Sequence, residues 1–559
     1  MRLCVLLCAS TLFISYNVVK AQPQHGYRIT FADKRGTKNF DQPTDLLSQR
    51  ALDRRTAQGI ALDSLDLPVS SLYKDSVLAL TGGKLHLTSR WFNYCVILLN
   101  DSSKIHALDG QAFVASIEYV AYHSAGLHKM SAEAVNEKFK SESVVIANDQ
   151  NKGTGTESFY GATWGQTRVV NGDYLHDRGY MGQGKLIAVC DEGFSFVDAN
   201  PGFDSLRRSG RLVDTYNFVK ATANVYQEGT HGTSSLSTMA AYLPGSYVGA
   251  APLAQYALYT TEYRDGEQPM ELDNYVAAME RADSIGADII TGSIGYNAFD
   301  RPSPYQLEYQ DINGHSTLVA RGANIATSKG ILFVASAGND GLTPWKYVLT
   351  PGDADSAMTV GSVDINKNIA ANSGYGPNSS GRTKPDVCLV GQPAAILNSS
   401  EVPTVAAGTS FATPQLAGWA ACLWQATSKA NPNRIRNAIT QSASLYSRPD
   451  VHYGYGVPDF GRAVELLDVK DTPALPSNWI SIHTNPIKDD LRIHLNQTHT
   501  GNVAMVVTDI SGRVVSREER RIVVGNHTLL LPGSHLSPGL YFFAISSDNR
   551  KAVLKFVKN

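Results

Sequence analysis

The chain has 559 residues, an apolar share of 43%, a charged share of 18% and a formal net charge of −2. This composition is typical of a folded protein, and at roughly 150 residues per domain the length predicts about three domains. The balanced charge provides no basic field that would attract a polyanion, so we expect no nucleic-acid partner.

Residues 1–21 are predicted to be a signal peptide. Arg2 supplies a positively charged N-terminal end, and residues 3–19 are mostly apolar. Val19-Lys20-Ala21 is a possible cleavage site for a signal peptidase, so Gln22 would be the first residue after export. The alternative is a membrane anchor. The apolar stretch is short and contains Ser15-Tyr16-Asn17, and no later segment approaches about 20 apolar residues. Export is therefore favoured.

The cysteines predict neither a disulfide framework nor a metal site. Two of the six lie in the predicted signal, and four remain, scattered along the chain: Cys95, Cys190, Cys388 and Cys422. Their apolar neighbours favour buried free thiols over a bridge or a reactive site. No CxxC pair and no HExxH motif occurs, so the ligands of a zinc ribbon or a zincin are missing.

Residues 22–157 are predicted to form a small α/β domain followed by a linker. Residues 84–99 alternate and then become continuously apolar, like paired strands, and residues 116–122 are typical of a further strand. Residues 131–157 are mostly polar and rich in asparagine and glycine. Such a segment favours an exposed, cleavable linker.

Residues 158–469 alternate short apolar runs with amphipathic stretches, which predicts βαβ units and a parallel sheet flanked by helices. The clearest buried strands are residues 185–190, 287–290 and 331–335. Leu272, Val276, Met279 and Ala282 have helical spacing, which favours a crossover helix before the second of these strands. Reactive groups are expected at the carboxyl ends of the strands.

Residues 477–559 follow a linker and are predicted to form an all-β sandwich. Strands are expected at residues 490–495, 501–508, 540–546 and 551–557. Turn signals lie at residues 509–512, Asn526 and residues 537–539.

Two motifs of the central region place an acid and a base. Asp191 ends the predicted strand at residues 185–190, where an aspartate alone is more often a turn or cap residue. His231 lies in Gly-Thr-His-Gly-Thr, before a predicted helix at residues 236–242, where a lone histidine is more often structural.

Two further motifs place a nucleophile and a hydrogen-bond donor. Ser410 lies in Gly-Thr-Ser-Phe-Ala-Thr-Pro, at or near the start of a predicted helix that would hold Pro414 in its first turn. Asn339 follows the strand at residues 331–335, where its carboxamide could stabilise an oxyanion. Taken singly, Ser410 could be an N-cap and Asn339 a turn residue.

The four motifs occur together, in the order Asp, His, Asn, Ser, each flanked by small residues. On these motifs, residues 160–466 resemble the subtilisin-like serine peptidase family. Val248-Gly249-Ala250-Ala251-Pro252, Lys384-Pro385-Asp386-Val387 and Gly454-Tyr455-Gly456-Val457-Pro458 are supporting matches. The resemblance implies hydrolysis of protein or peptide substrates through an acyl-enzyme on Ser410. His231 would be the base and then the acid, Asp191 would orient it, and Asn339 would stabilise the oxyanion.

The resemblance also implies where a substrate binds. Ser293 and Gly295 align with the segment that pairs with an extended peptide, and Ser336 and Gly338 precede the oxyanion residue. Thr291-Gly292 departs from the usual pattern of the family, which leaves the pocket shape open. Asp340 could favour a basic substrate side chain, although a solvated loop carboxylate is the commoner situation. No cofactor is required, and although calcium is common in the family, no loop supplies enough oxygen ligands to assign a site.

The two flanking regions resemble known accessory domains. Through Leu47-Ser48-Gln49-Arg50-Ala51-Leu52 and Leu67-Pro68-Val69-Ser70, residues 22–157 resemble the propeptide of subtilisin-like enzymes from Bacteroidetes. This resemblance implies an intramolecular inhibitor; the alternative is a permanent extra domain. Through Thr484-Asn485-Pro486-Ile487, residues 508–513, residues 536–541 and Lys555-Phe556-Val557-Lys558, residues 477–559 resemble the C-terminal sorting domain of the type IX secretion system. Thr484 stands where a tyrosine or proline often precedes the Asn-Pro pair. This implies a secreted or outer-membrane-associated protein whose partner is that machinery; the alternative is a carbohydrate- or protein-binding sandwich.

Two other functions remain open from the sequence. A catalytically inactive surface binding protein could keep the fold, although all four chemical positions are filled. An esterase is disfavoured, because the Gly-x-Ser-x-Gly elbow is absent around Ser410.

Overall fold

The computed structural model describes residues 24–123, 144–145, 155–264, 266–300, 305–399, 401–427, 430–467, 480–482, 486–497, 500–509, 513–547 and 550–559. The predicted signal peptide, most of the predicted 131–157 linker and the segment that joins the last two domains lie outside these residues. Within the described residues, no helix has the combination of length and hydropathy that a membrane span requires.

The N-terminal domain is an antiparallel sheet of four strands in the order β2-β3-β1-β4, accompanied by helices α1 and α2. Its elements are β1 (Gln24–Phe31), α1 (Gln49–Ala57), α2 (Ser71–Thr81), β2 (Lys84–Ser89), β3 (Tyr94–Leu99) and β4 (Val114–His123). The predicted strand pair at residues 84–99 is confirmed as β2 and β3, which pair antiparallel, and the strand predicted at 116–122 is β4.

The central domain is built on a seven-stranded sheet in the order β16-β15-β14-β11-β6-β10-β7, and every neighbouring pair is parallel. Its strands are β6 (Leu186–Asp191), β7 (Leu212–Asn217), β10 (Gln255–Thr260), β11 (Ile289–Gly292), β14 (Leu332–Ser336), β15 (Met358–Val363) and β16 (Val387–Val390). The predicted parallel sheet is therefore confirmed, and its three clearest strands are β6, β11 and β14.

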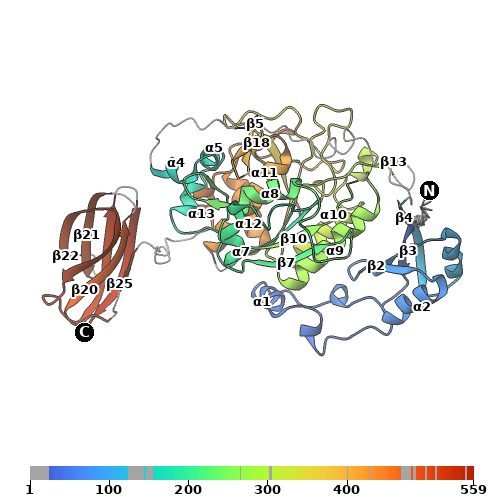
Figure 1. The fold of residues 1–559 in the computed structure, drawn as a ribbon, viewed down its shortest axis with the longest axis horizontal. Coiled ribbons are helices and arrows are strands. Elements are labelled where there is room, and N and C mark those ends of the chain that lie inside the picture. The colour runs from blue at the N-terminus through green and yellow to red at the C-terminus, as the bar shows by residue number, and fades with distance from the viewer. Residues whose placement is uncertain are drawn as a thin grey trace, which may run out of the picture.

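Helices cover both faces of this sheet (Figure 1). They are α4 (Gly155–Tyr160), α5 (Trp164–Val169), α6 (Asp173–His176), α7 (Asp204–Arg208), α8 (His231–Ala240), α9 (Met270–Ile285), α10 (Leu318–Ser328), α11 (Thr409–Gln425), α12 (Pro432–Ser442) and α13 (Phe460–Leu466). Shorter strands complete the domain: β5 (Val144–Val145), β8 (Tyr242–Leu243), β9 (Tyr247–Val248), β12 (Ala298–Phe299), β13 (Tyr305–Gln306), β17 (Ala394–Ile396) and β18 (Thr404–Ala406).

Strand β6 shows why these strands are apolar throughout. Ile187 and Val189 pack in one core with residues of α8 and α11, whereas Ala188 and Cys190 pack in a second core with residues of α9 and α10. Side chains alternate along a strand, so a sheet covered on both faces buries every position.

Two helices differ from their predicted bounds. Helix α8 begins at His231 itself and ends at Ala240, because the chain turns into β8 and β9. Pro414 is the sixth residue of α11 and lies beyond the first turn, where its missing N–H leaves a carbonyl of that turn without its helical donor.

The N-terminal domain lies beside α9 (Figure 1), and ion pairs bind it to this helix. Three arginines of this domain pair with Asp283 of α9: Arg54, Arg55 and Arg90. Their nitrogen–oxygen distances are at most 2.9 Å, and the Asp283 side chain is fully buried. Arg28 donates two hydrogen bonds, of 2.6 and 2.8 Å, to Asp273 of the same helix.

The C-terminal domain consists of two antiparallel sheets, β19-β20-β23 and β22-β21-β24-β25, around one apolar core, as the predicted sandwich requires. Its strands are β19 (Ile480–Ile482), β20 (Asp490–Gln497), β21 (Gly501–Asp509), β22 (Val514–Ile522), β23 (Gly525–Pro532), β24 (Gly539–Ser547) and β25 (Arg550–Lys558). The turn predicted at Asn526 is wrong, because Asn526 pairs with Asn496 inside β23. Strands β19, β22 and β23 were missed, and in β22 the charged residues hide the alternation.

Candidate active site

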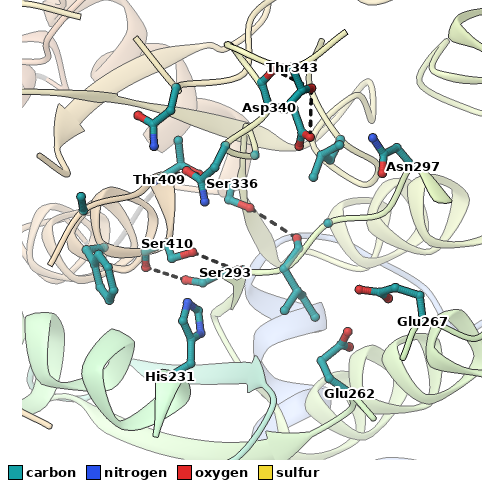
Figure 2. Close-up of a pocket in the computed structure, with 18 residues that line it drawn as sticks. His231, Glu262, Glu267, Ser293, Asn297, Ser336, Asp340, Thr343, Thr409 and Ser410 are labelled. Carbon is teal, nitrogen blue, oxygen red and sulfur yellow. Dashed lines mark hydrogen bonds between the residues drawn. The ribbon is translucent and has the colours of Figure 1, made fainter. Parts of the chain in front are cut away.

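Three elements of the central domain bring Asp191, His231 and Ser410 together. Asp191 is the last residue of β6, His231 the first of α8 and Ser410 the second of α11. The imidazole Nδ1 lies 2.7 Å from Asp191 Oδ1, and His231 and Ser410 line one cavity. Figure 2 shows the His231 ring pointing toward Ser410 and Ser293.

Charge and burial act in opposite directions on His231. Burial lowers the pKa of the ring, but the negative charge of Asp191 and the hydrogen bond to it raise the pKa by more, with smaller contributions from Glu192 and Glu262. The resulting pKa lies above the ordinary value of an imidazole. Because a carboxylate only accepts, Nδ1 carries the proton in this pair, which leaves Nε2 as the basic atom of a neutral ring.

Glu192 fixes the start of α8, a role that the sequence analysis missed. Its Oε1 accepts hydrogen bonds from the backbone N–H groups of Thr230, at 3.0 Å, and His231, at 3.1 Å. A carboxylate at a helix N-terminus satisfies amides that have no intrahelical acceptor and complements the helix dipole. The backbone of His231 is therefore held directly by the residue that follows Asp191.

Pro414 explains how Ser410 is connected to the neighbouring strand end. An ordinary residue at position 414 would donate its N–H to the Ser410 carbonyl, but proline has no N–H. The Ser293 hydroxyl donates to that carbonyl instead, at 2.7 Å, and the Ser410 hydroxyl donates to the Ser293 carbonyl at 3.3 Å. Ser293 thus forms hydrogen bonds with both the backbone carbonyl and the hydroxyl of Ser410, the candidate nucleophile.

Asn339 lies three residues beyond β14, and the structure orients its carboxamide. The backbone N–H of Thr409 donates to Asn339 Oδ1 at 2.9 Å, and the Thr409 hydroxyl does so at 3.2 Å. Because the oxygen is occupied by these donors, the Nδ2 group is the one available to an external acceptor. Gly408, with φ +145°, packs close to this carboxamide, and that backbone conformation strains any residue with a side chain.

The predicted substrate-binding residues line the same cavity, whose volume is about 460 Å³ (Figure 2). Ser293 and Gly295 follow β11, whereas Ser336 ends β14 and Gly338 follows it. The Ser336 hydroxyl donates to the Ile294 carbonyl at 3.4 Å. A Cβ on Gly295 or Gly338 would lie within 2.7 Å of Leu349, so both positions require the small residue.

The unusual Gly292 has a steric cause. A Cβ at this position would lie 2.0 Å from the hydroxyl oxygen of Tyr275 in α9. Tyr275 is fully buried and packs on Phe333 of the neighbouring strand. Only glycine therefore allows this tyrosine beneath the strand end.

A group of carboxylates beside the cavity was also missed. One oxygen each of Glu262, Glu267 and Glu271 lie within 4.8 Å of one another, and the first two residues line the cavity together with Asp340. Burial raises the pKa of Asp340. Three glutamates within ten residues were visible in the sequence, but the fold of the loop that gathers them was not.

This carboxylate group does not fit a calcium ion. Calcium takes six to eight oxygen ligands. Both oxygens of Glu271 accept backbone N–H groups, from Tyr263 at 2.7 Å and Gln268 at 2.9 Å. Glu262 Oε1 accepts the hydroxyls of Thr261 and Tyr296. Much of the donor capacity is thus already used within the protein.

The four cysteines outside the predicted signal are buried free thiols, as expected. Burial raises the pKa of each: Cys95, Cys190, Cys388 and Cys422. Such thiols are poor nucleophiles, and none of them lines the cavity.

Family models match three parts of the chain. The subtilase family matches residues 182–456. The peptidase S8 propeptide domain of Bacteroidota matches residues 26–138, and the secretion system C-terminal sorting domain matches residues 481–559.

Individual proteins are similar to the central region. Thermostable alkaline protease of Halalkalibacterium halodurans is 28% identical over 306 residues, which cover 54% of this chain and 73% of that protein. Subtilisin BL of Lederbergia lenta is 28% identical over 295 residues, which cover 53% of this chain and 95% of that protein. The crystal structure of epidermin leader peptide processing serine protease from Staphylococcus aureus has a TM-score of 0.53 at 17% identity, covers 79% of this chain and 98% of its own, and supports the fold. The chain therefore contains a subtilase domain, with a propeptide domain before it and a sorting domain after it, and it is a subtilisin-like serine endopeptidase.

Proposed function

We propose that the protein is a secreted endopeptidase that hydrolyses peptide bonds through an acyl-enzyme on Ser410. The observation that carries this proposal is the hydrogen-bonded pair of Asp191 and His231 in the cavity that Ser410 lines. An inactive binding protein would not need a buried carboxylate that raises the pKa of a cleft histidine.

The proposed reaction has two stages, the acylation of Ser410 and the hydrolysis of the acyl-enzyme. Ser410 Oγ forms a bond to the substrate carbonyl carbon as its proton passes to His231 Nε2, and Asp191 stabilises the imidazolium. Asn339 Nδ2 and the Ser410 backbone N–H donate to the oxyanion, where one such donor contributes about 3–4 kcal/mol. His231 then protonates the leaving amine as the carbon–nitrogen bond breaks. Water then attacks the acyl carbon as His231 takes its proton, the bond from that carbon to Ser410 Oγ breaks, and His231 returns the proton to Oγ as the acid leaves.

The flanking domains supply the proposed regulation and destination. A signal peptide at residues 1–21 would start export, residues 22–157 would inhibit the catalytic domain of residues 158–469, and residues 477–559 would engage the type IX secretion machinery. The enzyme would act outside the cell or at its outer surface after cleavage within residues 131–157. No cofactor enters this chemistry, and calcium remains an expectation from the family without an assigned site.

The test compares the purified chain with its Ser410→Ala variant. We expect peptide hydrolysis, labelling by a fluorophosphonate and self-cleavage within residues 131–157 in the wild type, and none of these in the variant. The loss of turnover should reach several orders of magnitude. Equal activity in the two proteins would remove Ser410 as the nucleophile, and labelling without peptide hydrolysis would favour an esterase.

A further inference from the structure

Leu349 lies between the two segments that are expected to bind the substrate. A Cβ placed on Gly295 would lie 2.7 Å from Cβ of Leu349, and a Cβ placed on Gly338 would lie 2.6 Å from its Cγ. The leucine side chain is partly exposed, and it lines the cavity that Ser410 and His231 also line. It therefore fills the space that the two glycines leave between their segments.

The backbone around Leu349 joins the same two segments. The Leu349 N–H donates to the Ala337 carbonyl at 3.2 Å. Thr350, the next residue, exchanges two backbone hydrogen bonds with Tyr296, of 2.9 and 3.2 Å. Residues 349–350 thus bridge the segments that follow β11 and end β14. Because this backbone is held on both sides, a substrate could displace it only by breaking these hydrogen bonds.

The proposed chemistry directs one substrate side chain into this space. During acylation, the carbonyl oxygen beside the scissile bond accepts hydrogen bonds from Asn339 Nδ2 and the Ser410 N–H. The Cα of the same substrate residue is bonded to that carbonyl carbon, and its backbone would pair with residues 293–295 as an added strand. The side chain on this Cα would therefore project between residues 293–295 and the segment that leads to Asn339, toward Leu349.

We propose that Leu349 restricts the substrate residue on the acyl side of the scissile bond to a small side chain, such as that of alanine or serine. This inference rests on the endopeptidase function proposed above and adds the chemical class of its substrate. An aromatic side chain at this position would overlap the leucine. A hydrophobic pocket discriminates about 10- to 200-fold for a single methylene, so the benzyl group of phenylalanine should be strongly disfavoured.

The experiment uses octapeptides that differ only in the residue before the scissile bond, which is alanine, valine, leucine, phenylalanine or lysine. Mass spectrometry of the products identifies the bond that is cut. For the wild type, we expect kcat/KM with alanine to exceed that with phenylalanine about tenfold or more. In Leu349→Ala, the ratio of phenylalanine to alanine should rise about tenfold, and in Leu349→Gly it should rise at least as far.

Leu342→Ala is the matched control. It makes the same change on a leucine that lies three residues beyond Asn339 and is 76% exposed, and it should keep the wild-type preference. Labelling by a fluorophosphonate shows that each variant has folded with its nucleophile in place. If the ratio stays unchanged in both labelled variants of Leu349, or if Leu342→Ala changes it equally, the assignment to Leu349 is wrong.

The wild-type series alone also tests the proposal. Cleavage of the phenylalanine or leucine peptide at least as fast as the alanine peptide would overturn it, although the endopeptidase function would stand. A preference for lysine would overturn it as well and would assign the specificity to Asp340, which lines the same cavity. A wild type that neither cleaves any peptide nor reacts with the fluorophosphonate would remove the proposed function and this inference with it.

Discussion

The carboxylates beneath the propeptide domain and those beside the catalytic cleft differ in their hydrogen-bond partners. Asp273 and Asp283 of α9 are fully buried; Asp273 pairs with one arginine and Asp283 with three, all from a distant part of the same chain. Glu262 and Glu267 lie beside a cavity whose described lining has no lysine or arginine. The first set therefore joins two domains of the chain through ion pairs, whereas Glu262 accepts the hydroxyls of Thr261 and Tyr296 within its own domain.

The largest expected effect comes from removing Asp283. In a precursor kept intact by Ser410→Ala, the further change Asp283→Ala removes the buried carboxylate that Arg54, Arg55 and Arg90 share, and among the described residues only Arg55 keeps a second ion pair, with Asp66. Breaking a buried pair in this way costs about 3–5 kcal/mol. Once an added protease has cut the linker, the propeptide should bind between about a hundredfold and a few thousandfold more weakly, as measured by its dissociation constant.

The matched control is Asp288→Ala. This residue pairs with Arg50, whose side chain is 36% exposed, so its loss should weaken propeptide binding by only about 1 kcal/mol or less. The Leu186 amide and Lys185, which Asp288 also contacts, belong to the catalytic domain and do not enter this comparison of binding. If the two variants weaken propeptide binding equally, buried ion pairing does not dominate this interface.

Asp386 provides a buried carboxylate whose partners lie within the catalytic domain. Burial alone would raise its pKa, but Lys384 and Arg436 hold the pKa of Asp386 at about 2. The pKa of Asp386 is lower in the folded protein than in the unfolded chain, where it is near 3.8. The ionised carboxylate therefore increases the free energy of unfolding above pH 3.8, and this contribution is lost as the pH falls toward 2. We expect a loss of about 2 kcal/mol over this range in denaturant titrations of the mature domain.

The acid dependence of stability should flatten in Asp386→Asn, even if this variant is less stable at neutral pH. An unchanged slope between pH 4 and pH 2 would assign the acid sensitivity to other carboxylates.

The smallest expected effect concerns Glu192, a cleft-side carboxylate that backbone amides already satisfy. Glu192 contributes to the raised pKa of His231, and a proton on His231 blocks its action as a base. Glu192→Gln removes the charge but keeps an oxygen for the amides, so the acid limb of kcat/KM should move to lower pH while the plateau rate is retained. A limb at unchanged pH, or a large fall of the plateau, would mean that Glu192 acts through structure alone.

The sequence predicted the parts of the site that depend on local pattern. Strand ends at Asp191 and before Asn339, and helix starts near His231 and near Ser410, follow from apolar runs bounded by small residues. The Asp283 cluster could not be predicted, because its arginines come from positions 54, 55 and 90 and meet only in three dimensions. Pro414 was visible, but its effect on the Ser410 carbonyl depends on where α11 begins, and helix ends are the least certain part of such predictions.

Pro414 has a mechanical consequence. The missing amide releases one carbonyl from the helix, and the Ser293 hydroxyl binds that carbonyl, while the Ser293 carbonyl receives the hydroxyl of Ser410. Ser293, which follows the strand proposed to pair with the peptide, is thereby joined by two hydrogen bonds to the helix that carries Ser410. A displacement of either element would be transmitted to the other, so the alignment of substrate and attacking oxygen is maintained even when the surrounding loops move.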